Sequence, residues 1–281
     1  MKKEKAVKEK KIREKKEKKK KKQKPVYEPV QGLLGAAEDY HIYHMIFSDR
    51  IMAALIGFAI GAVVAGVFFR NGVVAAAAGA VLIIPAQKFY RNYMLQKRQR
   101  NLLMQFKDLL ESLATSYSAG QNTQMAFQDA KTDMISIHGE KSDIVEEVDI
   151  IINGMANNLT PEVLLSNFAQ RSGLDDVASF ANVFEVVNRQ GSNLKQVISD
   201  SREIINDKIE IEMEIATMLQ GNKNELNIMM VMPLVIELSL RGLGTSENGV
   251  DFFINMGLKI ACLAVFAAAY MMGRKIVDIK L

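Results

Sequence analysis

Residues 51–69 form an uncharged stretch of nineteen amino acids, IMAALIGFAIGAVVAGVFF. A helix of that length is about 28 Å long, which matches the hydrocarbon core of a bilayer. The Arg-Asn-Gly sequence at 70–72 predicts a tight polar turn, and a second apolar run then extends to Ala86, with Pro85 near its end. Because Ala and Gly recur in both runs, the two helices can approach closely in lipid. We therefore expect residues 51–90 to form a transmembrane hairpin.

Two further apolar runs predict a second transmembrane hairpin over residues 226–273. The first run, 226–240, is short and contains Pro233 and Glu237, and a buried amphipathic helix is its alternative interpretation. The second, 252–272, is full length but contains Lys259. A charge at membrane depth is costly and is usually paired or functional. Three roles stay open for Glu237 and Lys259: an ion pair between the two helices, snorkelling to the interface, or a direct functional role.

Basic residues flank the four predicted spans unequally. The Lys-rich start, the basic residues between 88 and 100, Lys223 and the basic residues of 274–281 fall on one side, while Arg70 and Arg241 fall on the other. Because Lys and Arg are enriched in cytoplasmic loops, both termini and the long middle region should be cytoplasmic. This pattern predicts a multi-pass protein of the inner (cytoplasmic) membrane, with a juxtamembrane segment at 37–50 and tails at 1–36 and 274–281.

The N-terminal tail accounts for the basic character of the chain. Residues 1–24 hold fifteen Lys or Arg and four Glu, a net charge of +11, so the remaining residues carry −7 of the total of +4. The pattern predicts a disordered or loosely helical arm, and it is compatible with attraction to anionic membrane lipids. Nucleic-acid binders carry their charge on a folded face with interleaved aromatic residues, which this tail lacks, so no nucleic-acid partner is expected.

The middle region, residues 97–224, has the periodicity of a cytoplasmic helical domain. Its apolar residues recur at helical spacing, for example Leu102, Phe106, Leu109 and Leu113, and about 130 residues suffice for one compact core. The stretch IEIEMEIA at 209–216 alternates as a strand would, but it continues a longer helical pattern. We expect a final cytoplasmic helix over about 194–219 that leads toward the third span, with only Gly221, Asn222 and Asn224 interrupting the path. Such a connection could carry a displacement of the bundle to the membrane, and an ordinary membrane-proximal loop is the alternative.

Three helix stops recur in this region, at Gly120, Asn158 and Gly191. Gly and Asn suit the left-handed position that ends a helix, and each stop is followed by polar residues, such as Asn193, and a new amphipathic helix. Thr160 and Pro161 supply an N-cap and a first-turn proline after the second stop. The expected fold is therefore all-α, with four transmembrane helices and one cytoplasmic six-helix bundle made of three hairpins.

The sequence carries no recognisable catalytic or cofactor motif. It contains no GxGxxG, GxxxxGK[ST], HExxH or GxSxG pattern, and its single cysteine excludes an intrachain disulfide. His41 and His44 could share a helix face, but no carboxylate or thiol completes a metal-ligand set, so juxtamembrane packing or interface anchoring is favoured over metal binding. The acidic pairs 146–147 and 175–176 are expected to be exposed or to cap helices. We expect no enzyme activity, no cofactor and no metal.

The order of these features resembles the F-domain family of type II secretion systems, and within it the inner-membrane platform proteins of Tad/Flp pilus systems. The resemblance spans about residues 37–275 and rests on four segments: AEDYHIYHM at 37–45, FKDLLESLATSYSAG at 106–120, RQGSNL at 189–194, and the run from Leu219 through Pro233. It implies a helical bundle that contacts a hexameric secretion ATPase and couples its motion to the extraction of pilin subunits and filament assembly. Larger relatives carry two F domains, so the resemblance implies a homodimer or a second F-domain platform protein here.

Three classes of function follow from the sequence. As a platform, the chain would contact the ATPase through the polar faces around Gly120 and Gly191, and partner membrane helices through its first hairpin and Pro233. A small-solute transporter or channel using Glu237 and Lys259 is the main alternative, although a helical insertion of this size is unusual for one. A signalling receptor would need larger outside loops than the two short ones predicted.

Overall fold

The computed structural model describes residues 30–33, 35, 37–69, 71–190 and 194–242, together with residues 257, 261, 262, 264, 265, 268, 269 and 271–273. Seven helices succeed one another in the described part: α2 (Phe47–Phe69), α3 (Gly72–Ser118), α4 (Thr123–His138), α5 (Asp143–Ala156), α6 (Pro161–Ser172), α7 (Asp175–Gln190) and α8 (Leu194–Gly242). No strand occurs among these residues, so the predicted all-α class is confirmed for them.

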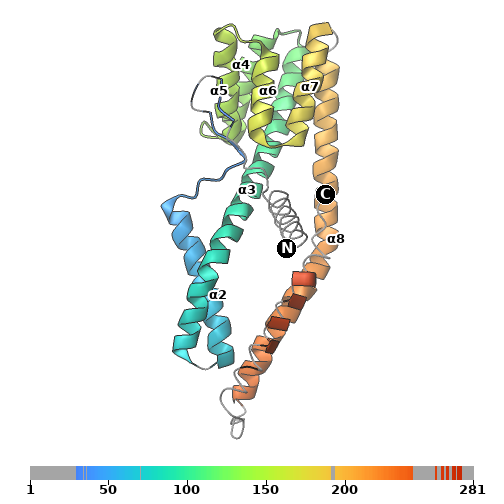
Figure 1. Ribbon diagram of the computed structural model, residues 1–281. Coiled ribbons are helices and arrows are strands. Elements are labelled where there is room, and N and C mark those ends of the chain that lie inside the picture. The colour runs from blue at the N-terminus through green and yellow to red at the C-terminus, as the bar shows by residue number, and fades with distance from the viewer. Residues whose placement is uncertain are drawn as a thin grey trace, which may run out of the picture.

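The molecule has a compact helical head from which long helices extend on one side (Figure 1). Two helices, α2 and α3, are long and apolar enough to cross a membrane, and they coincide with the first predicted hairpin. The apolar end of α8 contains the run predicted as the third span. Most of the fourth predicted span, including Lys259, lies outside the described residues.

Small residues form the contact between α2 and α3. The buried stripe on α2 consists of Ala53, Gly57, Gly61 and Ala65, which recur every four residues and therefore lie on one face. A methyl group added to Gly61 would lie 2.8 Å from the Cα atom of Gly79, closer than side-chain carbons approach. The glycines thus allow the two backbones to meet directly, as small residues do between membrane helices.

Both α3 and α8 run unbroken from the head into their apolar parts (Figure 1). Helix α3 has 47 residues and α8 has 49, which corresponds to about 70 Å each. Pro85 and Pro233 lie inside these helices rather than at their ends. The interruption expected at 221–224 is absent: one interior glycine costs only about 1 kcal/mol, and Gln220 donates a side-chain hydrogen bond to Asn224 one turn later.

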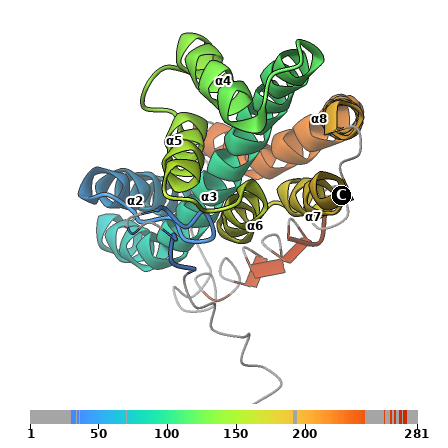
Figure 2. The same ribbon diagram turned by 90° about the horizontal axis from the view of Figure 1, so that it is seen from above.

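The head consists of the second half of α3, the four short helices and the first half of α8. From α3, the helices α4, α5, α6, α7 and α8 pack each against the next, and α8 also packs against α3 (Figure 2). Phe106 lies at the centre, with its ring 6.0 Å from that of Phe168 and 5.5 Å from that of Phe180. Since α3 and α8 both contribute to this core, the head is built directly onto the two long helices.

Successive helices of the head run antiparallel. Tyr117 near the end of α3 donates to Thr123 at the start of α4, whereas Asp108 pairs with His138 at the end of α4. Further pairs fix the directions of the other helices: Arg98–Asp143, Gly154–Leu164, Glu162–Asn188 and Asp176–Lys208. The connections after α3 and α5, the end of α7 and the start of α8 therefore share the end of the head that lies away from the apolar hairpin. We call this the far end.

Candidate functional site: a buried latch and a polar groove on the head

The segment before α2 is packed against the head rather than extending freely. Tyr40 is 1% exposed, and its backbone N–H donates to the Arg171 carbonyl oxygen at 2.9 Å. The guanidinium carbon of Arg98, on α3, lies 4.6 Å from the centre of the Tyr40 ring, a cation–π contact. The juxtamembrane segment is thus anchored in the core of the head immediately before the chain turns into α2.

A buried ion pair lies beneath Tyr40. Arg171 on α6 makes two hydrogen bonds to Glu147 on α5, at 2.7 and 2.5 Å, and both side chains are about 1–2% exposed. Arg171 also donates to the carbonyl oxygen of Glu38 and to Asn167, and the Tyr40 hydroxyl donates to Glu147 at 3.0 Å. We call Tyr40, Glu147 and Arg171 the latch, because together they join the juxtamembrane segment to α5 and α6.

The latch satisfies the polar groups that it buries. Burial raises the pKa of the Glu147 carboxyl, while the hydrogen bonds from Arg171 and Tyr40 oppose that shift. Burial and the neighbouring Glu147 carboxylate also raise the pKa of the Tyr40 phenol. Since each buried side-chain nitrogen and oxygen of the latch has a hydrogen-bond partner inside the head, this arrangement suits a structural fastening rather than proton transfer to a substrate.

Glu147 and its partners were missed by the sequence analysis. The pair Glu146 and Glu147 was expected to be exposed or to cap a helix, which holds for the exposed Glu146 but is wrong for Glu147. Burial of Glu147 depends on Arg171, 24 residues away, and on Tyr40, 107 residues away. A local sequence pattern does not predict a contact between residues so far apart in the chain. The periodicity of α5 does, however, place Glu147 on the same face as the apolar residues Ile144, Val148 and Ile151. A carboxylate on that face was the available signal.

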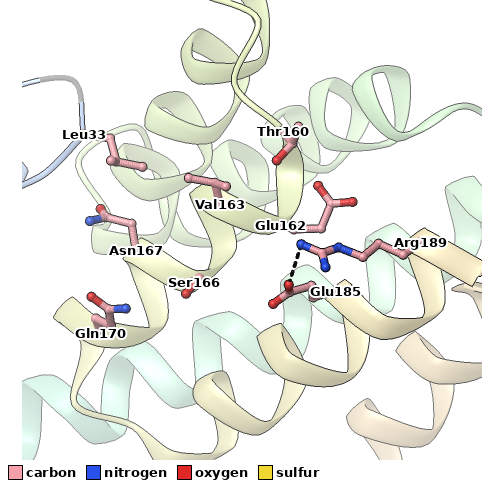
Figure 3. A pocket seen from close by; sticks show the side chains of 9 residues that line it. All are labelled: Leu33, Thr160, Glu162, Val163, Ser166, Asn167, Gln170, Glu185 and Arg189. Carbon is pink, nitrogen blue, oxygen red and sulfur yellow. Dashed lines mark ion pairs between the residues drawn. The ribbon is translucent and has the colours of Figure 1, made fainter.

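An open groove lies between α6 and α7, beside the latch (Figure 3). It encloses about 490 Å³ and is lined by Leu33, Thr160, Glu162, Val163, Ser166, Asn167, Gln170, Glu185 and Arg189. Leu33 belongs to the segment before α2, and Asn167 donates to the Gln31 carbonyl oxygen of the same segment. Because Asn167 also accepts from Arg171, the groove and the latch share one hydrogen-bond network.

The lining of the groove combines charged, polar and apolar side chains. Arg189 and Glu185 form an exposed ion pair at 2.9 Å, and Asn188 donates to Glu162 across the two helices. Although partial burial acts to raise it, this hydrogen bond, the backbone N–H and the Thr160 hydroxyl together lower the pKa of Glu162. Val163 is 47% exposed, so the mouth presents apolar and charged groups together. The lining residues include no histidine or cysteine that could activate Ser166 as a nucleophile.

Two of the predicted helix stops have the geometry that ends a helix. Gly120 has φ of +80° and Asn158 has φ of +63°. At each stop two backbone hydrogen bonds close the last turn, from Gly120 and Gln121 back to Tyr117 and Ser116, and from Asn158 and Leu159 back to Met155 and Gly154. Both positions lie at the far end of the head. Gly191 and Asn193 lie outside the described residues.

The two predicted membrane-depth residues within α8 lie close together. Pro233 and Glu237 are both partly buried, one helical turn apart. Since Lys259 lies outside the described residues, its predicted pairing with Glu237 stays a prediction.

No family model, curated protein or solved structure matches the chain. Its function is therefore inferred from the residues and contacts described here. Among the described residues no group of three His, Cys, Asp or Glu side chains could hold a metal ion. His41 pairs with Asp39 at 3.0 Å and His138 with Asp108 at 2.9 Å, so the structure gives these two histidines local partners.

Proposed function

We propose that this protein is an inner-membrane platform of a type IV/Tad-like pilus or type II secretion machine. In this role it couples a cytoplasmic ATPase to the extraction of pilin subunits and to filament assembly. The observation that supports the proposal most directly is the continuity of α3 and α8, each of which runs without a break from the helical head into an apolar segment.

This architecture suits mechanical coupling. A continuous helix transmits a displacement along its axis, whereas a flexible linker would absorb it. Within the head, Arg202 on α8 pairs with Glu111 on α3, and the latch fixes the segment that enters α2. A force applied to the head would therefore move all three helices together.

The proposal assigns partners to the two ends of the molecule. The ATPase would contact the far end of the head, around Gly120 and Asn158, and the sequence-predicted contact positions Gly191 and Asn193 would belong to the same interface. Pilin subunits and a second F-domain protein, or a second copy of this chain, would contact the small-residue hairpin and the region of Pro233. Four spans with both termini in the cytoplasm would place the head beneath the inner membrane.

Affinity purification with site-specific cross-linking tests the proposal. A photoreactive residue at Asn157, exposed at the far end, should cross-link to a secretion-type ATPase when the full chain is isolated in mild detergent. The matched control is the same probe at Glu140, which is exposed just after the end of α4, at the opposite end of the head, and should not cross-link to the ATPase. Failure to recover any such ATPase with the intact chain would refute the platform role. Solute flux that depends on Glu237 would instead support the transporter alternative.

A further inference from the structure

A band of cationic and aromatic side chains surrounds the hairpin where its apolar runs meet the head. Arg50 on α2 and Lys88 and Arg91 on α3 are all exposed. Exposed aromatic residues accompany them: Phe47 is 77% exposed, Phe89 57% and Tyr93 56%. We call these six residues the collar.

The packing of α2 against α3 places the two halves of the collar at one level. Gly61 meets Gly79, and Gly66 lies nearest Ala75, so the helices are antiparallel and in fixed register. In such an antiparallel pair, moving one residue toward the N-terminus of α2 corresponds to moving one residue toward the C-terminus of α3. Arg50 therefore lies level with Arg91. Figure 1 shows α2 running alongside the first part of α3.

The distance from the collar to the tip of the hairpin equals the thickness of a hydrocarbon core. Residues 51–69 of α2 contain no charge and span about 28 Å, and α3 is uncharged from Gly72 until Lys88. A bilayer that covers these runs would have its headgroups at the level of the collar. Aromatic and basic residues are the side chains that favour that layer.

The charge of the collar is not neutralised from within the described part of the chain. No ion pair to Arg50, Lys88 or Arg91 occurs among the described residues. The segments 46–53 and 88–95 contain one acidic residue, Asp49, which accepts a hydrogen bond from Tyr43. Arg98, two turns farther into the head, differs: it is committed to Glu38 and Asp143. Asp49 is the one acidic side chain in these segments, so the three collar cations leave a net positive charge at this level, which suits an anion from outside the described part of the chain.

We propose that the collar binds the phosphate headgroups of anionic phospholipids in the cytoplasmic leaflet. Arg50 on α2 and Lys88 and Arg91, three residues apart on α3, supply the positive charge at this level, and Phe47, Phe89 and Tyr93 lie among the glycerol backbones. The collar thereby concentrates acidic lipid around the hairpin and fixes its depth. The inference rests on membrane insertion of α2 and α3, which is part of the proposed function.

A single tryptophan reports directly on the lipids next to the collar, because the natural chain contains none. Full-length Tyr93→Trp protein is reconstituted into phosphatidylcholine vesicles with a minority of phosphatidylglycerol, and one lipid or the other carries brominated acyl chains. A basic residue near an anionic surface contributes about 1 kcal/mol of attraction, which corresponds to roughly a fivefold local enrichment, so brominated phosphatidylglycerol should quench up to about fivefold more than its bulk fraction predicts. Equal quenching per molecule by the two lipids would overturn the proposal.

Two matched variants separate the effect of the collar on quenching from that of the Lys-rich N-terminus, because the N-terminus is the same in both variants. Arg50→Gln, Lys88→Gln and Arg91→Gln together should abolish the excess quenching, whereas Lys131→Gln, Lys141→Gln and Lys195→Gln, on the head, should preserve it. Excess quenching that survives the collar substitutions would overturn the proposal.

A second tryptophan reporter distinguishes a collar that does not bind anionic lipid from a hairpin that does not enter the bilayer. Tryptophan in place of Ile60, which is 55% exposed in α2, should be quenched by brominated phosphatidylcholine. If it is not quenched, the hairpin is not in the bilayer, and both the collar and the platform role are refuted. Quenching at position 60 without lipid preference at position 93 refutes the collar alone.

Discussion

Replacing Arg171 by Met should destabilise the head far more than loss of an exposed ion pair would. Methionine keeps most of the apolar stem of Arg171 but leaves the Glu147 carboxylate buried with Tyr40 as its remaining donor. Removing one partner of a buried ion pair costs about 3–5 kcal/mol because the other charge stays uncompensated. The loss of the bonds to Asn167 and to the Glu38 carbonyl acts in the same direction.

The assay is denaturant unfolding of the full chain in detergent, followed by circular dichroism. Arg189→Met is the control, because its pair with Glu185 is exposed and should be worth less than about 1 kcal/mol. Tyr40→Phe removes only the hydroxyl and should cost about 1.5–3 kcal/mol, the value of a hydrogen bond to a charged group. If Arg171→Met costs no more than Arg189→Met, the latch does not hold the segment and our reasoning is wrong.

Three further predictions concern the hairpin, a helix stop and the groove. Gly61→Val should destabilise the α2–α3 contact by about 1–3 kcal/mol through overpacking. Gly66→Ala is the control and should be close to neutral, because its added methyl would lie 3.8 Å from the Cβ atom of Ala75. Thermal unfolding in detergent measures both. Asn158→Gly should preserve or raise the stability of the protein, while Asn158→Ala should lower it by about 1 kcal/mol. The reason is that a left-handed backbone penalises a Cβ atom whose side chain offers no local polar group. Equal effects of the two substitutions in denaturant titrations would contradict this prediction. The pKa of Glu162 is lower in the folded state than its ordinary value of 4.5, so the stability that its carboxylate contributes is present above pH 4.5 and is lost as the pH falls through the folded pKa. The free energy of unfolding of Glu162→Gln should therefore depend less on pH on the acid side than that of the unsubstituted protein. Superimposable pH profiles of the two proteins would exclude this contribution.

The local features of this protein were predictable from the sequence. Uncharged apolar runs of membrane length identified α2 and the first part of α3, and the recurrence of Leu and Phe at helical spacing identified the helices of the head. The stops at Gly120 and Asn158 were predicted because left-handed backbone is a property of single residues and their neighbours.

The continuity of the long helices was less predictable. Gly221, Asn222 and Asn224 were expected to interrupt the path of the last cytoplasmic helix, yet α8 continues through them. Pro233 likewise lies within a helix, as prolines can when neighbouring groups satisfy the backbone.

What the sequence by itself determined was therefore the all-α class, the apolar runs of the first hairpin, the apolar faces of the head helices and the stops at Gly120 and Asn158, since these depend on interactions within a few residues. Only the tertiary structure decided that Glu147 is buried, that Arg171 neutralises it and that Tyr40 closes over both. These residues come from three separate segments, and each is unremarkable in its local sequence. Their burial becomes favourable only when the folded head brings all three together, because a charge in a low-dielectric core is tolerated only beside its partner.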